Sequence, residues 1–297
     1  MNWMNVKYLS DFRLFSSLDQ KTKCVIWMIL SSIFFAVYIS LGRYTAQTEL
    51  NPLQLNFFRL FFALICFLPW VIVRGRGFFQ TDQIWTYGIR STISLAAMSI
   101  WFWSLAFAPV AVVTAISYVA PLITAVLAVL ILKEDVSRRR WLSLLVGFVG
   151  ILIILRPGID VVEIGAWLAL ANAFLMGFGA LVTKMLTTKD DPDKVVFIST
   201  LIMTSVALIP AVLTWTWPQP EYWPYLIALG PIAMLVHVTL TRAFSCADAS
   251  FVMALDFMRL PLVFFAGILI FSEVPSIYLI AGALLICWST FYVYRKG

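Results

Sequence analysis

Two charged residues stand in the middle of an otherwise apolar segment, MALDFMRLPL, at residues 253–262. Asp256 and Arg259 are three positions apart, so on a helix their side chains lie on one face and can pair. A charge at the centre of a membrane helix costs about 2.5–3.5 kcal/mol on insertion scales, so such residues normally face the interior of a helix bundle. The pair is therefore a structural lock between helices, part of a path for a solute, or both.

Arg59 is a further cation, about a third of the way through an apolar segment over residues 53–73, and Asn56 precedes it on the same helix face. No apolar segment carries a carboxylate at comparable depth except the one with Asp256. The charged side chains deep within the apolar segments are therefore one acid, Asp256, and two bases, Arg59 and Arg259. Either Arg59 reaches out to the membrane interface, or it meets an anionic group of a solute. Arginine binds a carboxylate or phosphate through two parallel hydrogen bonds, which makes such a group the expected partner.

Aromatic side chains at similar depth extend this candidate binding site. Trp101, in MSIWFWSLAF, and Tyr118 are each suited either to lining a cavity or to packing between helices. If they line a cavity, their faces suit a flat or cationic part of a solute. Trp103 lies nearer the end of its segment, where tryptophan is typical of the membrane interface.

Two residues are candidates for carrying a proton. His237 is the only histidine, and it is either a proton carrier or a neutral hydrogen-bonding residue of the interior. Asp256 is the other candidate, although pairing with Arg259 favours its ionised form. With one histidine and no HExxH pattern, we expect no metal ion and no cofactor.

The composition is that of an integral membrane protein. The chain has 297 residues, of which 62% are hydrophobic and 12% are charged, and its mean hydropathy is +0.94. Soluble domains carry about 25% charged residues. A helix needs about 20 apolar residues to cross a hydrocarbon core of about 30 Å. The sequence predicts ten such spans, at residues 24–43, 53–73, 86–106, 110–132, 141–155, 164–184, 195–215, 223–243, 249–271 and 275–294.

Lysine and arginine residues predict the orientation. With the N-terminus in the cytoplasm, the inner segments hold 16 of the 21 basic residues, and the outer segments hold only Arg43 and Arg156. Both termini are therefore expected in the cytoplasm, with residues 1–22 forming a cytoplasmic N-terminal segment. We expect the basic run KEDVSRRR (133–140) to attract anionic lipids, and the segment TTKDDPDK (187–194) to be a solvated linker with its three aspartates in water.

The chain is internally similar at an offset of 140 residues, which aligns Trp27 with Trp167 and Pro121 with Pro261. Five spans in each half reverse the second half in the membrane, so we expect two inverted five-helix repeats, at residues 23–156 and 164–297. Such repeats are typical of secondary transporters, whose sites lie where the repeats meet. Each proline removes an N–H and frees the carbonyl four residues earlier, so both helices should face an interior cavity there.

The motifs APVAVVTAISYVAPLITAVLAVLILKED (108–135) and ADASFVMALDFMRLPLVFFAGILIFSE (247–273) resemble the paired EamA-type repeats of the drug/metabolite transporter superfamily. Within it, DFMRLP resembles the group that takes up S-adenosylmethionine or riboflavin. The resemblance covers about residues 24 to 294 and implies a ten-helix bundle with a central substrate cavity. It also implies the bacterial inner membrane as the location.

These observations favour a secondary transporter that moves a small, carboxylate-bearing metabolite across the plasma membrane by alternating access. An intramembrane enzyme needs a nucleophile with a base, paired acids or a metal cluster, and the sequence offers none of these sets. A structural or lipid-scrambling membrane protein is the alternative. The expected partners are the small-molecule substrate and membrane lipids, with a homodimer left open. Topology accounts for most of the net charge of +6, so no nucleic-acid partner is expected.

Overall fold

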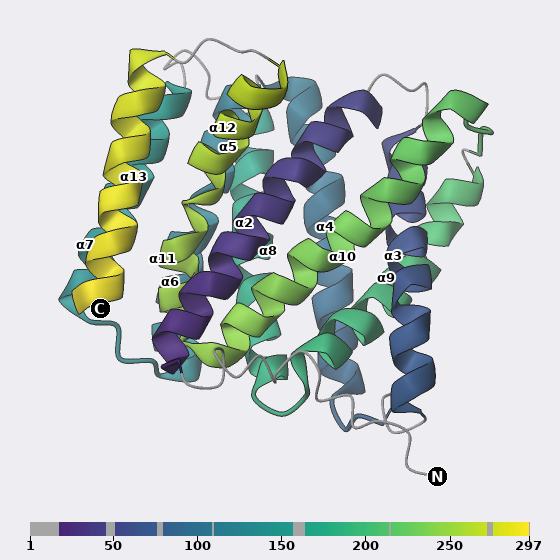
Figure 1. Ribbon diagram of the computed structural model, residues 1–297, viewed down its shortest axis with the longest axis horizontal. Helices are drawn as coiled ribbons and strands as arrows, with labels where there is room; N and C mark the ends of the chain where they lie inside the picture. Colours follow the sequence, from purple (N-terminus) through teal and green to yellow (C-terminus); the bar gives the residue numbers. More distant parts are fainter. Residues whose placement is uncertain are drawn as a thin grey trace.

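The computed structural model describes residues 18–45, 51–75, 80–108, 110–156, 164–213, 215–271 and 276–296. Every regular element within these ranges is helical (Figure 1). Eight described segments are long and apolar enough to cross a membrane by length and composition. This part of the chain is therefore an all-helical, multi-pass membrane protein.

Each expected span corresponds to one helix or to one interrupted helix. The uninterrupted helices are α2 (Gln20–Thr45), α3 (Pro52–Arg74), α4 (Ile84–Phe107), α7 (Arg138–Leu155), α8 (Ile164–Thr187), α9 (Pro192–Leu213), α10 (Trp223–Cys246) and α13 (Ile277–Lys296). The interrupted helices are α5 (Val110–Ser117) with α6 (Ala120–Leu127) and the π-helical turn Ala128–Leu132, and α11 (Ala249–Asp256) with α12 (Arg259–Phe271). The eight candidate spans include all of these except α4 and α7.

The helices pack mainly in pairs: α2 runs along α10, α4 along α8, and α7 along α13, while α3 packs against α9 and α10 (Figure 1). Helices in lipid associate through close packing rather than through the hydrophobic effect. Gly150 of α7 and Gly282 of α13 allow such packing. A Cβ atom on Gly150 would lie 2.9 Å from the Gly282 carbonyl oxygen, and one on Gly282 would lie 2.5 Å from that of Gly150. The two backbones therefore touch, which any side chain at either position would prevent.

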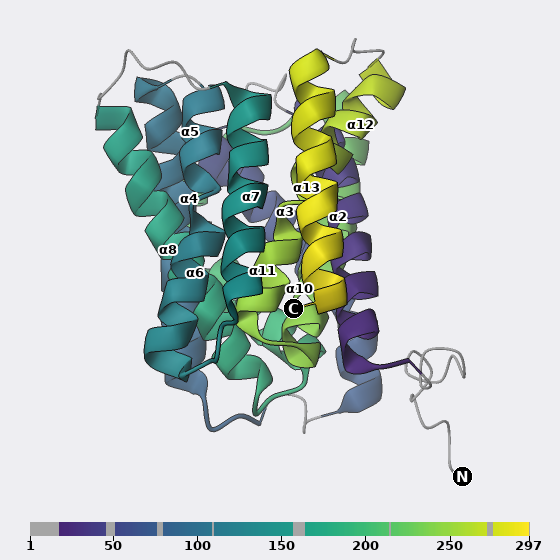
Figure 2. The same cartoon turned by 90° about the vertical axis from the view of Figure 1, so that its left-hand side faces the viewer.

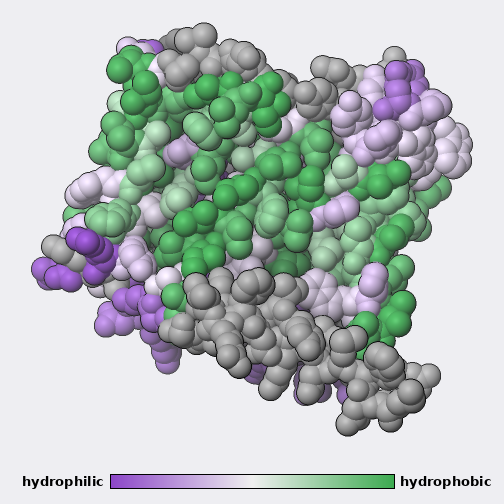
Figure 3. Space-filling view, viewed as in Figure 1, coloured by the Kyte–Doolittle hydropathy of each residue, from purple (hydrophilic) through white to green (hydrophobic). Residues whose placement is uncertain are grey.

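The outer surface is strongly apolar. Figure 3 shows hydrophobic side chains across the middle of one face, with hydrophilic groups gathered toward its corners. Side chains such as Ile72, Leu130 and Leu284 are largely exposed. An apolar surface of this extent is unsuited to water and fits contact with lipid tails.

The two ends of the described chain meet on one face of the bundle. The hydroxyl groups of Thr22, in the first turn of α2, and Tyr294, near the end of α13, are 3.1 Å apart. Residues 1–17, which hold most of the expected N-terminal segment, lie outside the described ranges.

The expectation of three solvated aspartates in TTKDDPDK is wrong for two of them. The Asp190 side chain is 10% exposed and accepts hydrogen bonds from four side chains. The second is Asp193. This residue is only 3% exposed, and its carboxylate accepts hydrogen bonds from Nε and Nη2 of Arg242, both at 2.9 Å. Arg74 Nη2 lies 3.5 Å from the same carboxylate. Pro192 begins α9 and places Asp193 in its first turn, where α9 meets α3 and α10. The sequence placed the charge next to the membrane but did not reveal the two arginines from other helices.

The run KEDVSRRR also makes contacts within the protein that a role in lipid attraction does not require. Glu134 accepts hydrogen bonds from the backbone N–H groups of Ala249 and Ser250, at 2.8 and 3.2 Å. It thereby caps the N-terminus of α11, where a negative charge is favourable. Arg140 Nη1 is 2.7 Å from the carboxylate of Asp248. This run therefore joins the segment before α7 to the start of α11.

Candidate functional site

The two interrupted helices break close to each other. Tyr118 and Val119 separate α5 from α6, and Phe257 and Met258 separate α11 from α12. The ring centroids of Tyr118 and Phe257 are 6.3 Å apart, so the breaks from the two parts of the chain are in contact (Figure 2). Each break precedes a proline, Pro121 or Pro261. A proline cannot donate a backbone hydrogen bond to the carbonyl four residues earlier, and its ring clashes with that carbonyl.

Pro261 was expected to leave the carbonyl of Phe257 without a hydrogen bond, but it does not. Phe257 O accepts a hydrogen bond from Leu260 N at 3.3 Å. The corresponding break in the first interrupted helix is also tightened, since Val119 N donates to Ile116 O at 2.9 Å. Both are the shorter i→i+3 bonds of a 3₁₀ turn. The backbone itself thus satisfies the Phe257 carbonyl, so this atom gives no evidence for a cavity.

Asp256 and Arg259 form the expected pair. Arg259 Nε is 2.9 Å from Asp256 Oδ1, and the two side chains are 12% and 13% exposed. The angle is not that of a hydrogen bond, so both atoms keep unused hydrogen-bonding capacity. Arg259 Nη2 donates to Ser31 Oγ of α2 at 3.0 Å, and its guanidinium carbon lies 5.0 Å from the centre of the Phe35 ring. The arginine therefore points at α2 within the bundle.

Arg59 lies between α2, α3 and α4. Its Nη2 donates to Asn56 Oδ1 at 2.6 Å and approaches Met98 Sδ at 3.8 Å. Its guanidinium carbon is 5.9 Å from the centre of the Tyr38 ring. Among the described residues, no carboxylate lies within ion-pairing distance of Arg59, and its buried Nε has no hydrogen-bond partner. These contacts hold the side chain among helices rather than extended along the lipid surface.

Helix α2 connects the two arginines, which the sequence reasoning missed. Phe35 and Tyr38 lie 6.2 Å apart between ring centroids, with Arg259 over the first ring and Arg59 over the second. Aromatic residues in an apolar span resemble lipid-facing ones. Only their spacing from Ser31, at four and seven positions on one helix face, offered a signal in the sequence.

The remaining candidates lie around these groups. Tyr118 packs at the helix breaks beside Phe257. Trp101 is half-buried and packs against a small cluster that includes Val113 and Ala169. His237 is half-buried on α10. Trp103 is 66% exposed, in keeping with a position at the interface.

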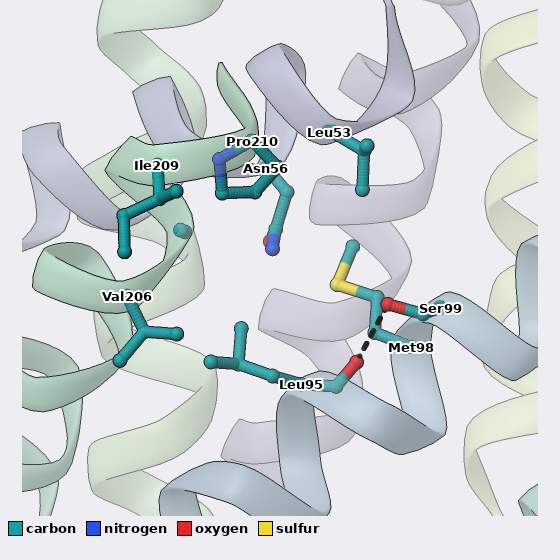
Figure 4. A pocket seen from close by; sticks show the side chains of 9 residues that line it. Leu53, Asn56, Leu95, Met98, Ser99, Val206, Ile209 and Pro210 are labelled. Carbon is teal, nitrogen blue, oxygen red and sulfur yellow. Dashed lines mark hydrogen bonds between the residues drawn. The ribbon is translucent and has the colours of Figure 1, made fainter. Parts of the chain in front are cut away.

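A cavity of about 270 Å³ lies between α3, α4 and α9 (Figure 4). Asn56 and Met98, the two side chains that contact an Nη2 hydrogen-bond donor of Arg59, also form part of its wall. The cavity and the arginine thus share two residues. In the part of the chain that the structure describes, no three His, Cys, Asp or Glu side chains come together as metal ligands would.

The EamA-like transporter family model matches residues 22–156 and again residues 163–295. The chain belongs to the EamA-like transporter family. This membership confirms the resemblance seen in the sequence and the expectation of a transporter rather than an enzyme.

Relatives of this EamA-like transporter are named as metabolite transporters. It is 30% identical to a riboflavin transporter of Vibrio cholerae, over 90% of this chain and 91% of the relative. It is 27% identical to an S-adenosylmethionine uptake transporter of Rickettsia prowazekii, with 91% of each chain covered. A solved crystal structure at 16% identity superimposes with a TM-score of 0.78, over 91% of this chain and 96% of that chain, which supports the fold.

Proposed function

We propose that this protein moves a small organic metabolite bearing a carboxylate across the plasma membrane. The relatives that carry riboflavin or S-adenosylmethionine support the class of cargo. The position of Arg59 is the observation from which we infer a carboxylate on the transported metabolite. Arg59 is held inside the bundle without an acidic partner, while Asp256 is already paired with Arg259. An anionic group that enters between the helices would supply the missing charge, and arginine suits a carboxylate in two-point contact.

The proposed binding site combines both arginines with aromatic faces. Phe35 and Tyr38 on α2 and Tyr118 at the helix break offer flat surfaces, which suit a planar or cationic part of the same solute. In this proposal Asn56 orients Arg59, and Asp256 orients Arg259. Trp101, which packs against Val113 and Ala169, stays a candidate for contact with the solute.

We further propose that ten spans form two inverted repeats, at residues 23–156 and 164–297, after a cytoplasmic segment at residues 1–22. A two-fold relation between the halves makes α2 equivalent to α8 and α4 equivalent to α10. Under this relation the contact between α2 and α10 corresponds to the contact between α8 and α4, and the helices make both contacts. The two proline breaks occupy equivalent places in these halves. Rocking of such halves about the breaks would give alternating access.

The alternative of a structural or lipid-scrambling protein explains less. Neither role requires an arginine without an acidic partner inside the bundle, and family membership favours transport. Proton coupling through Asp256 or His237 is part of the proposal. If protons are coupled to transport, Asp256→Asn or His237→Gln should alter the pH dependence of uptake.

Uptake into proteoliposomes tests this proposal. The screen covers amino acids, nucleoside derivatives and flavins, each with and without a pH gradient. For a transported solute with a carboxylate, Arg59→Ala should lower uptake by about 10- to 100-fold, the loss expected for a charged hydrogen-bonding group. Arg59→Lys keeps the charge but loses the two-point contact, and should retain an intermediate rate. Unchanged uptake by normally inserted Arg59→Ala would refute the role of Arg59, and transport of none of the three classes would refute the cargo.

A further inference from the structure

The cavity between α3, α4 and α9 has an almost wholly apolar wall. Leu53 comes from α3, Leu95 and Met98 from α4, and Val206 and Ile209 from α9 (Figure 4). Ser99 also reaches the wall, but its hydroxyl donates to Leu95 O at 3.0 Å and is thus satisfied. Seen from inside, the cavity therefore offers hydrocarbon contacts almost everywhere.

The amide of Asn56 is the exception. Asn56 is only 6% exposed, and Figure 4 shows its side chain pointing into the space between Val206, Leu95 and Met98. Its Oδ1 accepts from Arg59. A guanidinium group can only donate, which fixes the oxygen on the arginine side and the NH₂ group on the cavity side. Among the described residues, no acceptor meets that NH₂ group, so a donor with two hydrogens lines an otherwise apolar space.

On the α9 side, the cavity meets the exposed apolar surface that fits contact with lipid. Val206 and Ile209 are 48% and 65% exposed, and they continue the exposed stripe of α9 that includes Val212 and Leu213. A rise of about 1.5 Å per residue puts Asn56 about 6 Å below the first residue of α3. That depth is near the boundary between the hydrocarbon core and the headgroup region, since α3 itself is only slightly longer than a core of about 30 Å.

We infer that this cavity binds one acyl chain of a membrane phospholipid, whose ester carbonyl accepts a hydrogen bond from the Asn56 amide. The apolar wall matches the chain, the orphan donor matches the carbonyl, and the exposed apolar surface on the α9 side matches a ligand that is always present in the bilayer. The lipid would contact the two side chains that hold Arg59, and would thereby stabilise the position of the arginine. This site lies beside the proposed substrate site and does not depend on which solute is carried.

Photolabelling tests the site in the full-length protein reconstituted in nanodiscs. The probe is a phospholipid with a diazirine on one acyl chain, and labelled residues are mapped after digestion. We expect label at residues 53–56, 95–99 and 206–210 to exceed label on the outer face of α9, at Val212 and Leu213. Excess unlabelled phospholipid should compete for this label, whereas the same concentration of free fatty acid should compete weakly.

The Asn56→Asp variant removes the hydrogen bond to the lipid while it keeps the shape of the site. Aspartate keeps the acceptor for Arg59 and nearly the same volume, but it lacks the NH₂ donor and repels an ester oxygen. Label in the cavity should fall by about fivefold or more, the effect of losing one hydrogen bond. Asn51→Asp is the matched control, because this residue caps the start of α3 through its own oxygen. Equal labelling of the two variants, equal label on the outer face of α9, or competition by fatty acid alone would overturn the inference.

Discussion

At the scale of single residues, Asp193 illustrates how a buried carboxylate is accommodated near the end of a membrane helix. It is buried at the start of α9 and meets two guanidinium groups, one from α3 and one from α10. A buried charge is tolerated only when paired and hydrogen-bonded. The carboxylate therefore joins three helices, and loss of its charge would leave two cations facing each other.

Asp193→Asn tests this role. Removal of one partner from a buried ion pair costs about 3–5 kcal/mol, and the lower end is expected because Arg74 is 29% exposed. Thermal unfolding of the purified protein in detergent measures the loss. Asp191→Asn is the matched control, since the Asp191 side chain is 52% exposed and its pair with Arg74 should contribute only about 0–1 kcal/mol. Similar losses in the two variants would contradict the assignment.

Asp190 gives stability a dependence on pH. Partial burial opposes its charge, but hydrogen bonds from four neighbouring side chains outweigh burial, so the pKa of Asp190 lies below its ordinary value of 3.8. The donors are Lys194, Thr81, Tyr87 and Gln83. A carboxyl with a lowered folded-state pKa stabilises the fold above its unfolded pKa, about 3.9, and loses this contribution as the pH falls through the folded value.

Unfolding temperatures measured from pH 7 down to pH 3 test this dependence. The contribution of Asp190 should be constant above about pH 5 and should decline below about pH 4. Asp190→Asn should be less stable than the wild type at pH 7, and the difference should shrink at the acidic end. A difference that stays constant over the whole range would mean that the charge of Asp190 has no part in stability.

At the scale of elements, the two proline breaks are the features most directly tied to movement. Proline is about 3 kcal/mol less favourable than alanine inside a helix, so Pro121→Ala and Pro261→Ala should favour continuous helices. The contact between Tyr118 and Phe257 depends on the breaks. Uptake by either variant should fall by about tenfold or more, while the amount of folded protein stays the same or rises.

Pro69→Ala is the matched control for the break variants. Pro69 lies inside α3, which continues through it without interruption. Its replacement should leave uptake close to the wild-type rate. If Pro69→Ala and Pro121→Ala reduced uptake equally, the breaks would have no special role.

Local features of these elements could be predicted, whereas contacts between elements could not. The lengths of the apolar segments predicted the helices. Spacing along one helix predicted that Asp256 lies beside Arg259 and Asn56 beside Arg59. The place of Phe35 and Tyr38 between two arginines, and the burial of Asp193, depend on which helices become neighbours. A single sequence contains the periodicity of each helix but not the partner that each face meets. The roles of the six candidate substrate residues stay predictions.

At the scale of the whole molecule, the ionic contacts other than the Asp256–Arg259 pair lie at the ends of the helices. Arg74, Asp193 and Arg242 belong to the same side of the membrane by helix order. Lysine and arginine outnumber acidic residues in the segments that share this side, which the positive-inside rule assigns to the cytoplasm. Both termini are proposed to lie there.

Accessibility of introduced cysteines tests this orientation. Asp191 precedes the candidate span α9 and Glu221 follows it, and both are exposed, so they lie on opposite sides of the membrane. In a variant without the four native cysteines, an impermeant maleimide on intact cells should label Glu221→Cys. It should label Asp191→Cys only after the membrane is opened. The reverse pattern would place the termini outside.

The contact between Thr22 and Tyr294 has a consequence for how the gene can be rearranged. The start of α2 and the end of α13 are neighbours, since the hydroxyl oxygens of Thr22 and Tyr294 are 3.1 Å apart, so a short linker could join the two helices with little distortion. A circular permutant that starts at residue 164 and runs through that linker into residues 20–156 would then specify the same bundle with the order of its halves exchanged. The position of each half in the bundle would thus be independent of which half the ribosome makes first.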